Sequence, residues 1–209
     1  MAIFKNGILG AFNGKVGTVV GYELNGVPVG RSLPSKRKGK VSANEMANRK
    51  KFAYLQAWLQ PLTGFLRVGF KDYDPKFQGF VAAKSYNSKH ALTGEYPDFL
   101  VEPALALVSY GSLSLAETAT AVSEKPYTIT INWTNGRYQS MEKAMVVLYD
   151  IDSKRALMDT AATWRVHEKF EWVLDAHHSG KKIHVYLAFI AFDQSERSNS
   201  QYLGEVTVL

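Results

Sequence analysis

The sequence contains no cysteine, which excludes disulfide bonds, zinc–thiolate centres and thiol nucleophiles. Long apolar runs are also missing. The longest one, residues 183–192, is much shorter than the roughly 20 residues that a membrane-spanning helix needs, and it includes His184. The first residues do not combine a basic segment with an apolar core, so no secretory signal is evident. We therefore expect neither export nor a membrane span.

Recognisable catalytic motifs are missing too. Residues 10–16 differ from a phosphate-binding loop, because three residues rather than four separate the glycines and a valine replaces the hydroxyl residue. His167-Glu168 lacks the second histidine of a zinc-protease helix, and no Gly-x-Ser-x-Gly elbow occurs. The adjacent His177 and His178 fall in a predicted turn without an evident third ligand. The sequence thus predicts no enzyme, no cofactor and no metal site.

Charge is distributed unequally along the chain. The net charge is +6, yet residues 1–100 carry 15 Lys and Arg against 6 Asp and Glu, whereas residues 101–209 carry 10 against 13. This asymmetry has three interpretations: a polyanionic partner for the first half, head-to-tail attraction between copies, or a domain boundary near residues 98–101 with no functional meaning.

Residues 1–34 predict a glycine-rich β-ribbon. Seven of the sixteen glycines lie in residues 1–30, and Asn-Gly pairs at residues 6–7, 13–14 and 25–26 favour hairpin turns. Alternation over residues 15–24 predicts one strand with a bulky face and a nearly bare face that includes Gly17 and Gly21. The following strand contains Pro28, which cannot donate to a ladder, so this strand is expected at an edge.

Such a ribbon is marginally stable alone and must dock on another surface. Its glycine-lined face permits the close approach of another backbone, which belongs either to the rest of this chain or to a neighbouring copy, because exposed strand edges recruit further strands. We expect Gly17, Gly21 and Pro28 to form this contact.

The segment from residue 35 to residue 98 predicts a basic linker followed by helices. Residues 35–41 form the linker, and residues 42–98 form the helical part. A capping box at residues 42–45 predicts a helix that begins at Ala43, and Pro61 is expected to kink or restart it. An apolar stripe along this helix is assigned to the core: Phe52, Leu55, Leu59, Leu62 and Leu66. A second helix is expected at about residues 76–92. The ribbon and the two helices would form an α+β N-terminal part.

Residues 99–209 predict an all-β, immunoglobulin-like sandwich. Strands are expected at residues 127–133, 143–149, 168–174, 183–192 and 202–208. Trp133 and Trp172 are assigned to the core. The segment 183–192 is apolar on both faces, which favours a central strand buried on both sides over a strand that covers the first domain or a neighbour.

Several segments resemble a family of uncharacterised proteins from Bacteroidetes. They are FKNGI (residues 4–8), GKVGTVVGY (14–22), RSLP (31–34), FLRVGF (65–70), TGEYP (93–97) and YLGEV (202–206). The resemblance covers essentially the whole chain, and the C-terminal half is similar to a fibronectin type III or immunoglobulin-like module. The family has no assigned activity, so the resemblance implies no catalytic residue.

From these observations we expect a non-enzymatic structural subunit that assembles with other copies of itself through the ribbon, into a larger particle or filament. Its location would be the cytoplasm or a phage-like particle. The alternative is a non-specific nucleic-acid-binding protein that uses a basic arm at residues 31–51. The arm residues expected to neutralise phosphates are Arg31, Lys36, Arg37, Lys38 and Lys40.

Overall fold

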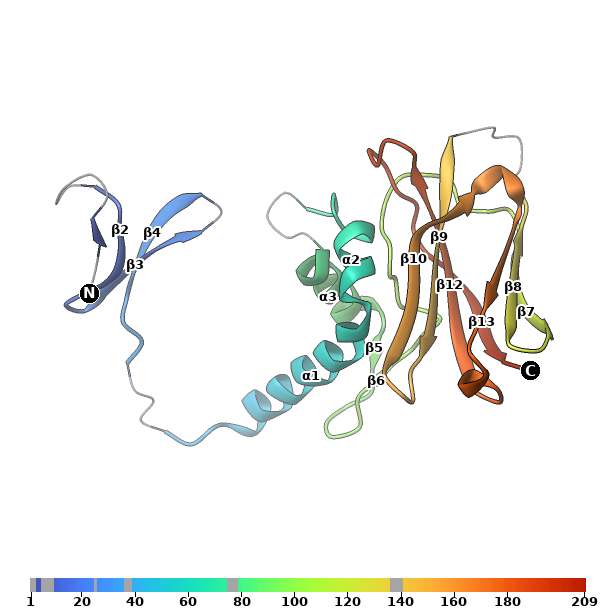
Figure 1. Ribbon diagram of the computed structural model, residues 1–209. Helices are drawn as coiled ribbons and strands as arrows, with labels where there is room; N and C mark the ends of the chain where they lie inside the picture. Colours follow the sequence, from blue (N-terminus) through green and yellow to red (C-terminus); the bar gives the residue numbers. More distant parts are fainter. Residues whose placement is uncertain (1–2, 5–9, 25, 36–38, 75–78, 136–140) are drawn as a thin grey trace. The chain divides into compact units, whose positions relative to one another are not determined.

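The computed structural model describes residues 3–4, 10–24, 26–35, 39–74, 79–135 and 141–209 (Figure 1). The chain divides into two compact units. The N-terminal unit is Met1–Ser42 and the C-terminal unit is Ala43–Leu209. The division thus falls at the start of the first helix, whereas the charge asymmetry suggested a boundary near residues 98–101.

The described residues of the N-terminal unit form a four-stranded antiparallel sheet in chain order: β1 (Ile3–Phe4), β2 (Phe12–Val16), β3 (Val19–Leu24) and β4 (Val27–Ser32). The prediction of one strand over residues 15–24 is wrong, because Gly17 and Thr18 form a turn between β2 and β3. Gly17 has a φ of +56°, a left-handed conformation that glycine adopts without steric cost. The bulky face and the bare face are therefore not two sides of one continuous strand.

The second hairpin of this sheet agrees with its prediction. Leu24 pairs with Val27, so residues 25–26 connect β3 and β4. The edge position predicted for the proline-containing strand is confirmed, since β4 is the last strand of the sheet and Pro28 lies opposite Glu23. The Asn-Gly pair at 13–14 lies within β2 rather than in a turn, and Asn25 and the pair at 6–7 lie outside the described residues.

Helices open the C-terminal unit: α1 (Ala43–Leu59), η1 (Gln60–Leu62), α2 (Thr63–Gly69) and α3 (Gly79–His90). The predicted start at Ala43 is confirmed. The restart at Pro61 is also confirmed, because this proline lies in the first turn of η1. A backbone N–H at this position would have no hydrogen-bond partner within the helix, so proline is tolerated there. The second predicted helix corresponds to α3, which is shorter than residues 76–92; residues 75–78 lie outside the described part of the chain.

Strands form the rest of this unit. β5 (Leu92–Thr93) pairs with β6 (Leu100–Val101). The following strands are β7 (Ala119–Lys125), β8 (Thr128–Trp133), β9 (Glu142–Asp150), β10 (Arg155–Trp164), β11 (Lys169–Val173), β12 (Lys182–Ala191) and β13 (Gln201–Thr207). Within the described residues 119–135 and 141–209 they build two antiparallel sheets, β10-β9-β12-β13 and β11-β8-β7, which make an immunoglobulin-like sandwich. Strands β7 and β10 were not predicted.

The four-stranded sheet of this sandwich is buried on both faces. Successive residues of β9 point alternately into two hydrophobic clusters: Val146 and Leu148 pack toward the three-stranded sheet, and Val147 and Tyr149 pack against the helices. Strand β12 alternates in the same way and pairs with both β9 and β13, which confirms the predicted central strand buried on both sides. Helices α1, α2 and α3 thus cover the outer face of the sheet (Figure 1).

Polar side chains fix these layers to one another. The Tyr149 hydroxyl of β9 donates a hydrogen bond of 2.7 Å to the Trp58 carbonyl of α1. Between the sheets, the buried Arg165 guanidinium lies 2.6 Å from Glu142 Oε2 and 3.9 Å from the centroid of the Phe189 ring. Trp133 is buried in the sandwich core, as predicted, and Trp172 packs against that core while remaining partly exposed. In the described part of the chain, no helix has the length and apolar character that crossing a membrane requires.

Candidate assembly surface

The sheet of the N-terminal unit has no apolar core among its described residues. Within residues 10–24, 26–35 and 39–42 of this unit, Gly21 is the one residue that is buried. Large apolar side chains are exposed on it instead: Ile3, Val16, Val19, Leu24 and Val27. Leu24 and Val27, which face each other across the β3–β4 hairpin, are 55% and 61% exposed. Val16 and Val19 lie on one face of the sheet and Leu24 and Val27 on the other, so apolar side chains are exposed on both faces.

The residues predicted for the assembly contact have different surroundings. At Gly21 a Cβ would lie 2.3 Å from the Phe12 carbonyl oxygen, so the close backbone approach at this position is made by β2 of the same chain. At the turn residue Gly17 a Cβ would meet no atom within 4 Å. Pro28 lies in the edge strand β4. The close backbone contact at Gly21 is therefore made within the N-terminal unit, whereas Gly17 and Pro28 lie beside open surface.

The basic arm is partly described. Arg31 lies in β4, with its guanidinium 5.6 Å from the centroid of the Tyr22 ring. Lys40 is an exposed residue of the linker, and Lys36, Arg37 and Lys38 lie outside the described residues. Residues 1–42 contain seven Lys and Arg and one acidic residue, whereas residues 43–209 contain eighteen of each kind. The whole net charge of +6 therefore belongs to the N-terminal unit.

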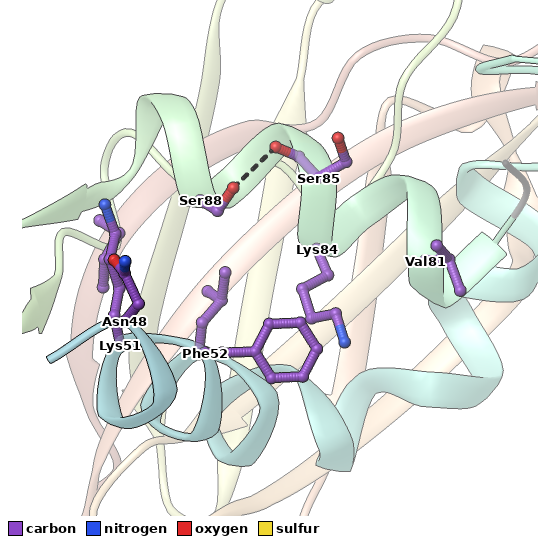
Figure 2. Close-up of a pocket in the computed structure, with 9 residues that line it drawn as sticks. Asn48, Lys51, Phe52, Val81, Lys84, Ser85 and Ser88 are labelled. Atoms are coloured by element: carbon purple, nitrogen blue, oxygen red, sulfur yellow. Dashed lines mark hydrogen bonds between the residues drawn. The ribbon is translucent and has the colours of Figure 1, made fainter. Parts of the chain in front are cut away.

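A groove between α1 and α3, here called the helix groove, lies on the C-terminal unit (Figure 2). It has a volume of about 410 Å³, and its apolar lining includes Phe52, Leu55 and Val81. The Lys84 ammonium lies 3.6 Å from the centroid of the Phe52 ring and donates a hydrogen bond of 2.8 Å to Gln56 Oε1, while burial lowers the pKa of Lys84. Phe52 is thus an exposed residue beneath a lysine, and its assignment to the core is wrong.

A polar chain connects the neighbouring strands β12 and β13. His184 Nδ1 lies 2.8 Å from the Tyr202 hydroxyl, and His184 Nε2 lies 3.7 Å from Glu205 Oε2. Burial lowers the pKa of His184 and raises the pKa of Tyr202. At neutral pH the Tyr202 hydroxyl is therefore protonated and the imidazole is uncharged, so the hydrogen bond joins two neutral groups. This protonation state favours a structural contact between the strands over an activated tyrosine nucleophile.

The turn that contains the two adjacent histidines also brings in a third potential ligand. Asp175 precedes η3 (Ala176–His178), and its carboxylate lies near the rings of His177 and His178. Asp175 was not predicted as a ligand, because the tight turn rather than a recognised motif spacing brings the three side chains together. An acidic residue two positions before a histidine pair is the signal that could have indicated the cluster.

The fold and the exposed sheet define a helix-covered, immunoglobulin-like sandwich preceded by a separate small β-sheet. Residues 11–204 match the model of a family of unknown function, DUF6266, and the chain belongs to that family. This confirms the expected membership in an uncharacterised family, and the Bacteroidetes origin stays a prediction. No curated protein matches the chain. Among solved structures, the chain is similar to the fibronectin type III domain of human collagen alpha-1(XX) chain, with 14% identity, a TM-score of 0.36, and coverage of 46% of this chain and 87% of that chain.

Proposed function

We propose that this protein is a non-enzymatic structural subunit that self-assembles through the sheet of its N-terminal unit. The observation that carries this proposal is the lack of a buried apolar side chain in the strands β2, β3 and β4 of that sheet, residues 12–16, 19–24 and 27–32. A single-layer sheet of this length buries too little surface to be stable alone, because hydrophobic burial must offset the entropy of ordering the chain. The exposed side chains of this sheet therefore require a covering surface.

A second copy is a suitable partner because it carries the same unpaired strand edge. The edge strand β4 exposes backbone groups that can extend the sheet into a neighbouring molecule. Pairing of β4 with β4 would give a closed, two-fold symmetric dimer, whereas pairing of β4 with the other edge strand, β1, would give an open filament. Either arrangement would place Val27 of β4 at the junction between copies, with its cross-strand partner Leu24 beside it on β3.

The combined substitution Leu24→Lys and Val27→Glu tests this proposal on the full-length protein. These residues are direct cross-strand partners, so the new opposite charges preserve the hairpin while they disfavour an apolar interface. We expect the wild-type mass by light scattering to be a multiple of the 23.3 kDa chain mass, and the variant mass to fall to 23.3 kDa.

The matched control is Val173→Glu, which places a charge at an apolar residue on β11 of the C-terminal unit that is 73% exposed. This variant should keep the wild-type mass. A wild-type mass of 23.3 kDa would contradict the proposal, and so would an unchanged mass in the Leu24→Lys, Val27→Glu variant.

A second candidate function, non-specific nucleic-acid binding, is favoured by the concentration of the net charge in residues 1–42. It predicts that duplex DNA binds with an affinity that falls steeply with salt. Neutralising Lys36, Arg37, Lys38 and Lys40 together should then reduce both the affinity and the steepness of its salt dependence. Binding that these four substitutions leave unchanged would exclude this function for the basic arm.

A further inference from the structure

The cluster at the end of β11 combines ligand types that bind transition metals. It consists of a carboxylate, Asp175, and two imidazoles, His177 and His178. Asp175 and His177 are exposed, whereas His178 is buried at 9% exposure. Imidazole nitrogen and carboxylate oxygen are ligands that zinc and related divalent ions take in proteins.

The turn itself orients the buried histidine. In η3 the backbone N–H of His178 donates to the Asp175 carbonyl at 3.0 Å, and the Nδ1 of the same residue lies 3.3 Å from that carbonyl oxygen. Because a carbonyl oxygen only accepts hydrogen bonds, this contact places the ring proton on Nδ1. The lone pair is then on Nε2. A histidine that ligates a metal commonly has its other ring nitrogen held by a backbone carbonyl in this way.

The exposed members of the cluster lie close enough to complete a site. One ring nitrogen from each of His177 and His178 and one carboxylate oxygen of Asp175 lie within 4.8 Å of one another. The rings of His177 and His178 have centroids 3.9 Å apart. The Asp175 carboxylate makes no side-chain capping bond to η3, and its Oδ2 lies 3.9 Å from His177 Nδ1.

We propose that Asp175, His177 and His178 bind a divalent transition-metal ion of the zinc type. Three atoms that are at most 4.8 Å apart always leave a point that lies within about 2.8 Å of each of them. Rotation of the exposed Asp175 and His177 side chains shortens these distances to the roughly 2.0–2.2 Å typical of zinc ligands. Three protein ligands leave a fourth tetrahedral position open to water.

The surroundings modulate this site. A cavity of about 410 Å³ adjoins the cluster, and its lining includes Asp150, Lys154, Arg155 and Lys181 as well as the three ligands. Lys181 Nζ lies 3.5 Å from Asp150 Oδ2, so these two charges offset each other. Lys154 and Arg155 reduce the affinity for a cation, and they favour a small anion over water at the open position of the metal.

The test uses full-length protein purified without a histidine tag and stripped of metal with a chelator. Titration with ZnCl₂ in a calorimeter should show one equivalent of bound zinc per chain. Asp175→Asn and His177→Ala each remove a ligand at an exposed position, and each should weaken zinc binding at least tenfold. Mutating a residue that only supports a ligand already lowers metal affinity by about 10–100-fold, so the loss of a ligand itself should cost no less. Neither change is expected to disturb folding, because both side chains are exposed.

His167→Ala is the matched control, since His167 is an exposed histidine of η2 (Arg165–His167) and does not belong to the cluster. It should leave the zinc affinity unchanged. As a second readout, Co²⁺ bound by the wild type should give a visible absorption spectrum that is lost in His177→Ala. Absence of saturable binding by the wild type would overturn the proposal. Equal weakening by His167→Ala, or zinc binding unaffected by Asp175→Asn and His177→Ala, would also overturn it.

Discussion

The two units of this chain use antiparallel sheets in opposite ways. In the C-terminal unit, β9 and β12 bury alternate residues in two hydrophobic clusters, so both faces of their sheet are covered. In the N-terminal unit, the described strands bury Gly21 and expose apolar side chains such as Leu24 and Val27. The two sheets thus differ in apolar burial rather than in strand pairing. The covered sheet gains hydrophobic stabilisation within its own unit, whereas we propose that the exposed sheet gains it from another copy.

This contrast predicts that changes within the C-terminal core destabilise the protein, whereas changes in the N-terminal sheet affect association. The largest effect is expected for Arg165→Met, which leaves the buried Glu142 carboxylate without its 2.6 Å partner. Breaking a buried ion pair on one side costs about 3–5 kcal/mol. Urea unfolding should show this loss, and adding Glu142→Gln should restore part of it. A loss below about 1 kcal/mol, the range of an exposed pair, would contradict the account.

A smaller effect is expected for Tyr149→Phe, which removes the hydrogen bond from the sheet to the Trp58 carbonyl of α1. Leaving that carbonyl without a partner should cost about 1–3 kcal/mol. Burial raises the pKa of Tyr149 to about 12, so the hydroxyl remains a donor throughout the neutral range. Tyr127→Phe is the control, since Tyr127 is exposed, and it should change the free energy of unfolding by less than about 0.5 kcal/mol. Equal effects of the two substitutions would show that the bond does not hold the helices to the sheet.

The third prediction concerns pH. Burial lowers the pKa of His184 below its ordinary value of 6.5, so the folded state binds this proton less readily than the unfolded state. The associated stability is fully present above pH 6.5 and declines as pH falls from there through the folded-state pKa. We expect His184→Gln to make the free energy of unfolding less dependent on pH between 7 and 5. A profile that His184→Gln leaves unchanged would assign this pH dependence to other groups.

The substitution Gly17→Ala lies in the N-terminal unit, and we expect it to have the smallest effect on the stability of the C-terminal unit. Alanine at a φ of +56° costs about 1–2 kcal/mol, although the added Cβ meets no neighbouring atom. The strain should loosen the β2–β3 hairpin, seen as faster amide exchange, and leave the urea midpoint of the C-terminal unit unchanged. A lowered midpoint would show that the two units unfold together.

Sequence reasoning succeeded where a pattern had one structural meaning. The two-sided apolar run 183–192 indicated the central strand β12, and the capping box with Pro61 indicated the start of α1 and its restart. It failed at β7 and β10, whose small and polar residues are mostly half-buried or exposed and lack a clear alternation. It also failed at Gly17, because the alternation of residues 15–24 continues across the turn.

The candidate sites show the same limit. The exposure of Phe52 depends on the groove between α1 and α3, which helical periodicity does not reveal. The proximity of Asp175 to His177 and His178 depends on the turn at η3. Sequence patterns predicted elements, and tertiary packing decided which side chains remain available for binding.

The most direct test of self-assembly through the N-terminal sheet is amide hydrogen exchange measured at several protein concentrations. If another copy stabilises the sheet, protection of β2, β3 and β4 should increase with concentration, whereas protection of β9 and β12 should stay constant. Protection of β2, β3 and β4 that is strong and independent of concentration would contradict the account, because the sheet would then be stable without a second copy.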